Sequence, residues 1–261
     1  MPEPFGQRIL ILAPHPDDET VGFCAAIGRA RAAGSALSVV FLTHGCVEAA
    51  AMWPWTWSRY AAAVARRRAE AARVVEALGL FVAGWSERPA RHLWRELAAA
   101  EAEARAAVAA TDADQLWVPA FEGGNPDHDG ANAIAARLAD TGLSVLEFAE
   151  YNLEGGRVRA NQFPTEIGAE QTLVLEPAER ETKRRALALY VSERSNLGYV
   201  TTDREVFRPL AAHDYRRPPH AGRLWWARFQ WSPVRHPMID FTPPTEVYAA
   251  IGAYRGGGPS P

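Results

Sequence analysis

The sequence predicts an α/β fold with a mostly parallel, Rossmann-like sheet flanked by helices. Two observations support this prediction. Short apolar runs, such as residues 9–12, are typical of strands that are buried on both faces of a parallel sheet. These runs alternate with longer Ala-rich stretches that carry Arg and Glu, as solvated helices do.

The first elements form a βαβ unit. Residues 8–13 are a predicted strand, residues 21–33 a helix for which Gly34 is a suitable C-cap, and residues 37–42 a second strand. In sheets of this kind, ligands bind beyond the carboxyl ends of the strands. The segments that follow each strand are therefore the first place to look for a functional site.

The later elements are predicted from the same patterns. Helices are expected at residues 59–77, 93–110, 131–138 and 179–190, and strands at residues 80–84, 116–119, 143–151 and 172–175. Beyond residue 192 the pattern weakens into an aromatic-rich, irregular extension, residues 193–255, and a disordered tail, residues 256–261. We expect a single domain over residues 1–261, with its core at residues 8–192.

Composition narrows the function classes. The formal net charge of −3 and pI of about 6.2 give no sign of a nucleic-acid partner. Two cysteines, Cys24 and Cys46, do not make a disulfide framework, so a reducing compartment is expected. Residues 1–4 lack the features of a signal peptide, and no apolar run reaches membrane-spanning length. We therefore expect a cytoplasmic protein without membrane insertion.

The first predicted strand runs directly into a cluster of one imidazole and three carboxylates. His15 and Asp18 are three residues apart, so both side chains can lie on one face of a helical turn. Imidazole nitrogen and carboxylate oxygen suit a zinc-type ion, and Asp17 between them would point toward an attacking water. The alternative is a plain helix N-terminus, where acidic residues are favoured.

A second polar stretch, residues 121–130, follows the predicted strand at residues 116–119. A catalytic zinc site usually has three protein ligands, so one more is needed. His128 is the best candidate, because its Gly-rich loop falls at the same sheet edge, and His44 is the second choice. A single loop histidine is more often a surface residue, so the prediction depends on both stretches together.

These stretches resemble the PIG-L/LmbE-like family of zinc-dependent N-deacetylases over about residues 8–192. The resemblance is carried by His15-Pro16-Asp17-Asp18-Glu19, Leu42-Thr43-His44-Gly45, Arg67 with Glu70, Asn125-Pro126-Asp127-His128 and the segment 183–192. It implies zinc bound by His15, Asp18 and His128, with Asp17 as general base. It also implies a Rossmann-like fold without a nucleotide. Glu19 and Asp127 are interpreted as groups that orient ligands.

One departure concerns the proton donor. The family's second motif usually begins with histidine, which is thought to polarise the substrate carbonyl, and here that position is Asn125. An asparagine amide can donate a hydrogen bond to an oxyanion but cannot supply a proton near neutral pH. Either Asp17 both takes and returns the proton, or another residue gives it, for which His44 is the candidate.

The resemblance implies an N-acylated amino sugar or its conjugate as substrate, with acetyl as the expected acyl group. Trp55 could form a wall of the substrate cleft, although packing beneath a loop is the commoner role of such rings. Arg67 could contact sugar hydroxyls or a phosphate, although half of a helix-surface ion pair is the commoner role.

Three other functions compete. A metal-dependent amidase or esterase acting on a non-sugar substrate would use the same chemistry. A non-catalytic sugar-binding scaffold would fit the departure at Asn125. A nucleotide-binding module is disfavoured, because the Gly-x-Gly-x-x-Gly motif is absent after the first strand and acids stand where a pyrophosphate would sit.

Overall fold

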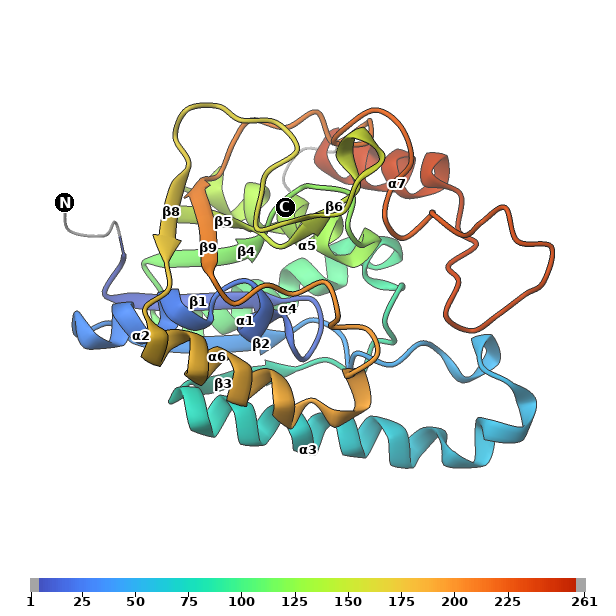
Figure 1. Ribbon diagram of the computed structural model, residues 1–261. Coiled ribbons are helices and arrows are strands. Elements are labelled where there is room, and N and C mark those ends of the chain that lie inside the picture. Colours follow the sequence, from blue (N-terminus) through green and yellow to red (C-terminus); the bar gives the residue numbers. More distant parts are fainter. Residues whose placement is uncertain (1–4, 257–261) are drawn as a thin grey trace.

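The computed structural model describes residues 5–256. Within them lies a seven-stranded sheet with the strand order β3-β2-β1-β4-β5-β9-β8 (Figure 1). The strands are β1 (Arg8–Ala13), β2 (Ala36–Phe41), β3 (Phe81–Trp85), β4 (Gln115–Pro119), β5 (Ser144–Ala149), β8 (Gln171–Val174) and β9 (Arg204–Pro209). The first five strands are parallel, and β9 pairs antiparallel with both β5 and β8. The predicted mostly parallel α/β fold is confirmed.

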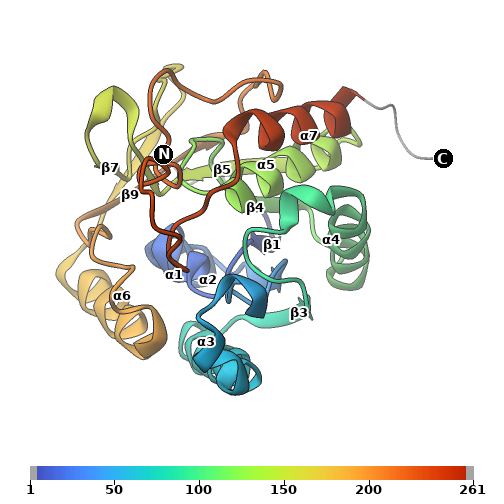
Figure 2. The same cartoon turned by 90° about the vertical axis from the view of Figure 1, so that its right-hand side faces the viewer.

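Helices cover both faces of the sheet (Figure 2). One face carries α2 (Cys24–Ala32), α3 (Tyr60–Leu78) and α6 (Pro177–Leu189), and the other carries α4 (Leu97–Thr111), α5 (Pro126–Ala139) and α7 (Pro244–Gly256). Side chains alternate across the sheet, so Ile9 and Ile11 of β1 pack into one hydrophobic cluster and Leu10 and Leu12 into the other. This explains why β1 is apolar throughout.

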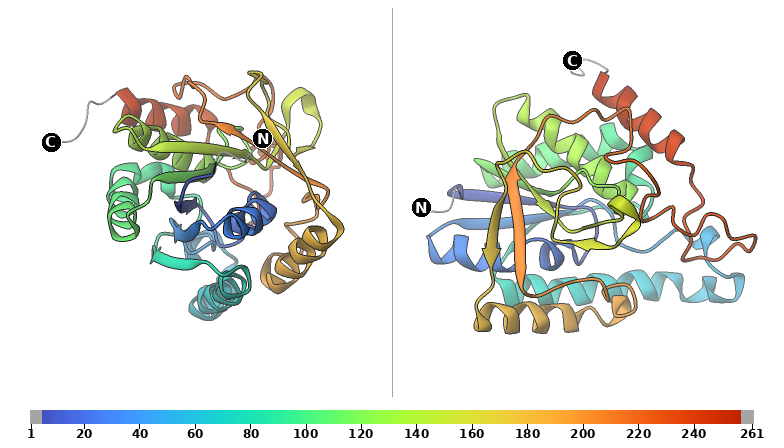
Figure 3. Two further views of the ribbon diagram at one scale, coloured as in Figure 1. Left: turned by 90° about the vertical axis from the view of Figure 1, so that its left-hand side faces the viewer. Right: turned by 45° about the horizontal axis from the view of Figure 1, so that its top comes forward.

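Two views show the same layering from other directions (Figure 3). Helices α3 and α6 lie side by side along one face, and α7 lies beside α5 on the opposite face. None of the helices within residues 5–256 has the length and apolar character needed to cross a membrane.

The predicted helix at residues 21–33 is interrupted. A short helix, α1 (Asp18–Val21), ends at Gly22, and α2 begins at Cys24. A Cβ atom at Gly22 would lie 2.8 Å from Oε1 of Glu150, so the glycine makes room for this buried carboxylate. Packing against the end of β5 therefore accompanies a break that helical periodicity alone did not reveal.

The second motif lies on a helix rather than in the loop that the sequence analysis expected. Helix α5 begins at Pro126, five residues before the predicted start, and the Asn125 side chain accepts a hydrogen bond of 2.9 Å from the backbone nitrogen of Asp127. Asparagine at the N-cap followed by proline is a strong helix-start signal. The residues were in the sequence, but the glycines before them suggested a longer loop.

The segment after residue 192 is more regular than expected, because it supplies β9 and α7. Strand β9 is tied to β5 by a buried ion pair of 2.7 Å between Arg208 Nε and Glu147 Oε1. Most of residues 210–243 lacks helices and strands, as predicted. Of the tail that was expected to be disordered, Gly256 ends α7 and residues 257–261 lie outside the described residues.

The strand order places the functional segments together. The chain passes from β1 to β2 on one side of β1, whereas β4 pairs with its other side. A crevice is expected where the strand order reverses in this way, beyond the carboxyl ends of β1 and β4. Both polar motifs begin at these two strand ends.

Candidate metal centre

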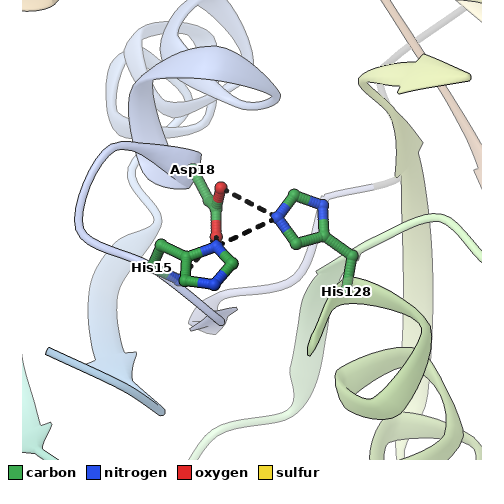
Figure 4. A group of neighbouring side chains, drawn as sticks. All are labelled: His15, Asp18 and His128. Carbon is green, nitrogen blue, oxygen red and sulfur yellow. Dashed lines mark hydrogen bonds and ion pairs between the residues drawn. The ribbon is translucent and has the colours of Figure 1, made fainter. Parts of the chain in front are cut away.

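His15, Asp18 and His128 meet between the ends of β1 and β4 (Figure 4). Nδ1 of His15 lies 3.2 Å from Nε2 of His128, which in turn lies 3.2 Å from Oδ1 of Asp18. All three side chains are buried, and one ligand atom from each lies within 4.8 Å of the others. The predicted trio is thus assembled from the segment that follows β1 and from α5, more than 100 residues apart in sequence.

The chain's local geometry sets Asp18 in place. The Asp18 carboxylate accepts a hydrogen bond of 2.6 Å from the backbone nitrogen of His15, which closes the turn after β1. Burial alone would raise the pKa of Asp18, but the adjacent His128 and His15 lower it below its usual range. Asp18 is therefore held as a carboxylate, the form that binds a metal.

Two further carboxylates approach the outer nitrogens of the histidines. Nε2 of His15 donates to Oδ2 of Asp127 at 2.9 Å, as expected from the sequence. Nδ1 of His128 lies 3.6 Å from Oε2 of Glu150, and neither has a hydrogen-bond partner among the described residues. Carboxylates in these positions fix the tautomer and orientation of metal-binding histidines.

The role of Glu150 was missed by sequence reasoning. Its position immediately after β5, at the same sheet edge as the two motifs, is the signal that could have revealed it. Burial raises the pKa of Glu150 well above its usual value, and nearby Asp18 and Glu122 raise it further. Burial likewise raises the pKa of Glu19 to about 7 and of Glu122 to about 8.

The donor set fits a divalent metal ion. Two imidazole nitrogens and a carboxylate oxygen converge, as in catalytic zinc sites with three protein ligands. Buried acids surround them, and a cation would offset this concentration of negative charge.

Asp17 lies beside the trio and is held by two hydrogen bonds, one to its side chain and one from its backbone. Its Oδ2 accepts a hydrogen bond of 3.1 Å from Nη2 of Arg67, and its backbone nitrogen donates to Oε2 of Glu19 at 3.1 Å. Glu19 therefore positions Asp17 rather than a candidate ligand. Burial raises the pKa of Asp17 to about 6, although the Arg67 guanidinium opposes the shift.

Arg67 is not half of a helix-surface ion pair, which was the alternative to a substrate contact. It is buried, lines the cavity described below, and joins Asp17 to Glu193, whose Oε1 lies 2.6 Å from Nη1 of Arg67. The arginine therefore positions Asp17 in this structure. A direct contact with substrate stays a prediction.

Asn125 is the N-cap of α5 and also lines the cavity. Its side-chain oxygen is occupied by the backbone of Asp127. Among residues 5–256, its amide NH₂ group has no hydrogen-bond acceptor. This group is therefore available to an acceptor in the cavity. The structure thus accommodates the predicted donor role of this residue.

His44 and Trp55 lie outside the lining of the cavity. The two ring nitrogens of His44 face the hydroxyl of Tyr60 and the backbone nitrogen of Cys46, each at 3.2 Å, and burial lowers its pKa. Trp55 is 72% exposed and stacks on Trp53 with ring centroids 5.0 Å apart. Neither side chain contributes to the cavity lining, so a proton-donor role for His44 and a wall role for Trp55 stay predictions.

A cavity of about 660 Å³ opens over the trio. It is bounded by the strand ends, by the loops at residues 45–52 and 193–199, and by the irregular segment at residues 225–240. Its aromatic lining consists of Tyr151, Tyr199, Trp225 and Trp226. Because these residues carry no recognisable motif, sequence reasoning did not assign them to the site.

Fold and site together define a Rossmann-like α/β protein that shares the fold of the LmbE-like deacetylases and has a candidate metal centre at the carboxyl edge of its sheet. The sequence model of the PIG-L family, described as GlcNAc-PI de-N-acetylase, matches residues 10–139, which hold both motifs. The chain belongs to this family, and the resemblance inferred from the sequence is confirmed. No curated protein matches the chain in sequence.

Solved structures of deacetylases share the fold. A40926 pseudoaglycone deacetylase Dbv21 aligns with a TM-score of 0.61 and 18% identity, over 79% of this chain and 99% of that chain. A deacetylase from the teicoplanin biosynthesis pathway aligns with a TM-score of 0.61 and 15% identity over the same shares. N,N'-diacetylchitobiose deacetylase from Pyrococcus horikoshii aligns with a TM-score of 0.50 and 15% identity, over 84% and 86%.

Proposed function

We propose that this chain is a metal-dependent hydrolase that removes an N-acyl group, acetyl in the simplest case, from an amino sugar or its conjugate. The observation that supports this most is the convergence of His15, Asp18 and His128 beside Asp17 under a cavity. The family description and the deacetylase neighbours support the reaction class. The compounds named for those neighbours, teicoplanin, A40926 pseudoaglycone and diacetylchitobiose, support a sugar-bearing substrate.

In this proposal His15, Asp18 and His128 hold one divalent ion, and zinc suits the donor set. When bound, such an ion supplies Lewis acidity and lowers the pKa of a water molecule toward neutrality. One neighbour is described as a zinc-inhibited form of teicoplanin deacetylase, so other divalent ions are tested beside zinc. Asp127 and Glu150 keep the two imidazoles oriented from behind.

Asp17 acts as the general base. It takes a proton from water as the water oxygen attacks the carbonyl carbon of the N-acyl group. Asp17 then returns this proton to the amine nitrogen as the carbon–nitrogen bond breaks, which leaves a carboxylate and a free amine. Arg67 holds the Asp17 carboxylate in place through both steps.

Asn125 replaces the usual family histidine as a neutral hydrogen-bond donor. Its NH₂ group is proposed to donate to the acyl oxygen as negative charge develops there. Because an amide has no proton to give near neutral pH, Asp17 carries both proton transfers in this chain. The rate then depends on one titrating carboxyl rather than on two separate groups.

The test measures release of amine and carboxylate by metal-loaded protein. The panel holds N-acetylglucosamine, its methyl glycoside, diacetylchitobiose, an N-acyl glycopeptide, a simple anilide and an acetate ester. Release from the amino sugars or the glycopeptide alone supports the proposal. Release from the anilide or ester alone indicates an amidase or esterase, and no release with metal stoichiometrically bound indicates a sugar-binding scaffold.

The cytoplasmic location and the absence of a nucleic-acid partner stay proposals. Cys24 and Cys46 are free thiols, which is compatible with a reducing compartment. Fractionation of the cells that make this protein, with detection by antibody, tests the location.

A further inference from the structure

An arginine from the irregular segment forms part of the cavity wall. Arg228 lies with its guanidinium carbon 3.9 Å from the centroid of the Trp225 ring and 4.7 Å from that of Phe229. Its Nη1 also donates to the carbonyl oxygen of Trp225 at 2.6 Å. Stacking and hydrogen bonding therefore hold this long side chain in one orientation at the cavity wall.

The turn that carries Arg228 is anchored to the second motif. The backbone nitrogen of Trp225 donates to the carbonyl oxygen of Gly123 at 3.0 Å, two residues before Asn125. Gly123 has a φ of +71°, and a Cβ atom there would lie 2.7 Å from Leu224. Glycine at this position therefore permits the close approach of the two segments.

An aromatic path leads from the candidate metal centre to Arg228. The Tyr151 ring lies 5.8 Å from the His128 ring and 5.5 Å from the Trp225 ring, between ring centroids. Tyr199 completes the cluster, 4.2 Å from Tyr151 and 5.6 Å from Trp225. A sugar ring lying on these faces would extend from the metal toward the guanidinium.

The charge of Arg228 is not balanced by the protein. The other arginines of the cavity face acids, since Arg67 contacts Asp17 and Arg91 lies 3.8 Å from Asp240. No carboxylate within residues 5–256 forms an ion pair with Arg228. Burial lowers the pKa of Arg228, and the nearby Tyr151 and Tyr199 oppose this shift.

We propose that Arg228, laid on Trp225, binds an anionic group of the substrate, a carboxylate or a phosphate, so that the preferred substrate is an acidic amino-sugar conjugate. This inference rests on the proposed function and names the substrate class of the same site. The planar guanidinium offers paired donors that match a carboxylate or phosphate. The bound anion would balance the positive charge of Arg228, which no carboxylate within residues 5–256 does.

Binding and hydrolysis test the subsite separately. Glucosamine, glucosamine 1-phosphate, glucosamine 6-phosphate and muramic acid are titrated calorimetrically into zinc-loaded protein, since these free amines cannot be deacylated. Hydrolysis is measured on their N-acetyl forms. The variants are Arg228→Gln, Arg228→Lys and the control Arg235→Gln, which removes the same charge from an exposed position outside the cavity lining.

We expect wild-type protein to prefer at least one anionic sugar over glucosamine. Arg228→Gln should weaken binding and kcat/KM for that sugar by about tenfold or more, the usual worth of a charged hydrogen bond, and leave neutral sugars within about twofold. Arg228→Lys should restore part of the preference, and Arg235→Gln should change nothing. Muramic acid and the phosphates distinguish a carboxylate ligand from a phosphate ligand.

The contrary results are equally distinct. The subsite is overturned if wild-type protein shows no preference for any anionic sugar, or if Arg228→Gln weakens neutral and anionic sugars alike, as a purely packing role would. Hydrolysis without charge preference would remove the subsite and leave the proposed function standing. Charge-dependent binding without hydrolysis would keep the subsite and remove the proposed function.

Discussion

At the scale of single residues, Asp17 has the most constrained position in the site. Its φ of 142° is rare for any residue other than glycine, and its carboxylate and backbone nitrogen are held by Arg67 and Glu19. Backbone strain of this kind persists only where surrounding contacts enforce it, and such residues cluster at active sites. The conformation therefore favours a chemical role for Asp17 over a plain helix-capping role.

Replacing Asp17 by Asn should abolish most of the activity and leave metal binding intact. The amide fills the same space but cannot accept a proton, so we expect kcat to fall by about 10²–10⁴-fold. Metal content by mass spectrometry and amine release are measured on the same preparation. Full activity in this variant would remove the general-base role.

Asn125 combines two roles that substitutions can separate. Asn125→Asp keeps the N-cap of α5 but loses the NH₂ donor, so stability should hold while kcat falls. Asn125→Ala should lose activity as well. It should also lower the free energy of unfolding by about 1 kcal/mol, because the N-cap of α5 is removed. Urea denaturation and amine release are compared for both variants, and equal activity of the Asp variant and wild type would exclude the donor role.

At the scale of elements, one buried ion pair joins four of them. Nζ of Lys183 on α6 lies 2.8 Å from Oε1 of Glu205 on β9 and donates to the carbonyl oxygen of Val21. The Glu205 carboxylate also accepts from the backbone nitrogens of Ala25 and Ala26 at the start of α2. Strand β9, from the C-terminal part of the chain, is thereby held against the two helices that follow the first motif.

Lys183→Met should destabilise the fold strongly, because Glu205 would be left as an uncompensated buried charge. A loss of about 3–5 kcal/mol in the free energy of unfolding is expected, measured by urea denaturation. Adding Glu205→Gln should recover part of it. Arg185→Met on the exposed face of the same helix is the matched control and should change stability by less than about 0.5 kcal/mol. A small effect of Lys183→Met would show that the site tolerates the lost charge.

At the scale of the whole molecule, the candidate metal centre bridges the two halves of the sheet. His15 and Asp18 follow β1, whereas His128 belongs to the unit that begins with β4. An ion that binds the folded chain but not the unfolded chain stabilises by mass action. The metal is therefore expected to add stability to the whole fold as well as chemistry.

Removal of the metal should lower Tm, and zinc should restore it. At a free zinc concentration of about 100 times Kd, the expected stabilisation is about 2.7 kcal/mol. Thermal unfolding is measured on chelated and zinc-loaded protein, with His128→Ala as the control in which the zinc-dependent shift should vanish. An equal shift in His128→Ala would place the ion at another site.

Much of the architecture could be predicted from the sequence. Apolar runs gave the parallel strands, since burial on both faces requires them, and residues 13–19 and 121–130 indicated a site at two strand ends. Strand β9 and helix α7 were missed, because Pro and aromatic residues around them mask their periodicity. The start of α5 was misjudged although Asn125 and Pro126 signalled it.

The sequence by itself determined which residue types were available for metal chemistry and which strands would carry them. Only the tertiary structure decided how they meet. It places Glu150 beside the outer nitrogen of His128, Arg67 against Asp17, and His44 against Tyr60. The cavity wall around Trp225 and Arg228 was also decided there. The reason is physical, since local sequence fixes backbone propensity and burial, whereas contacts between distant segments depend on the packing of the whole chain.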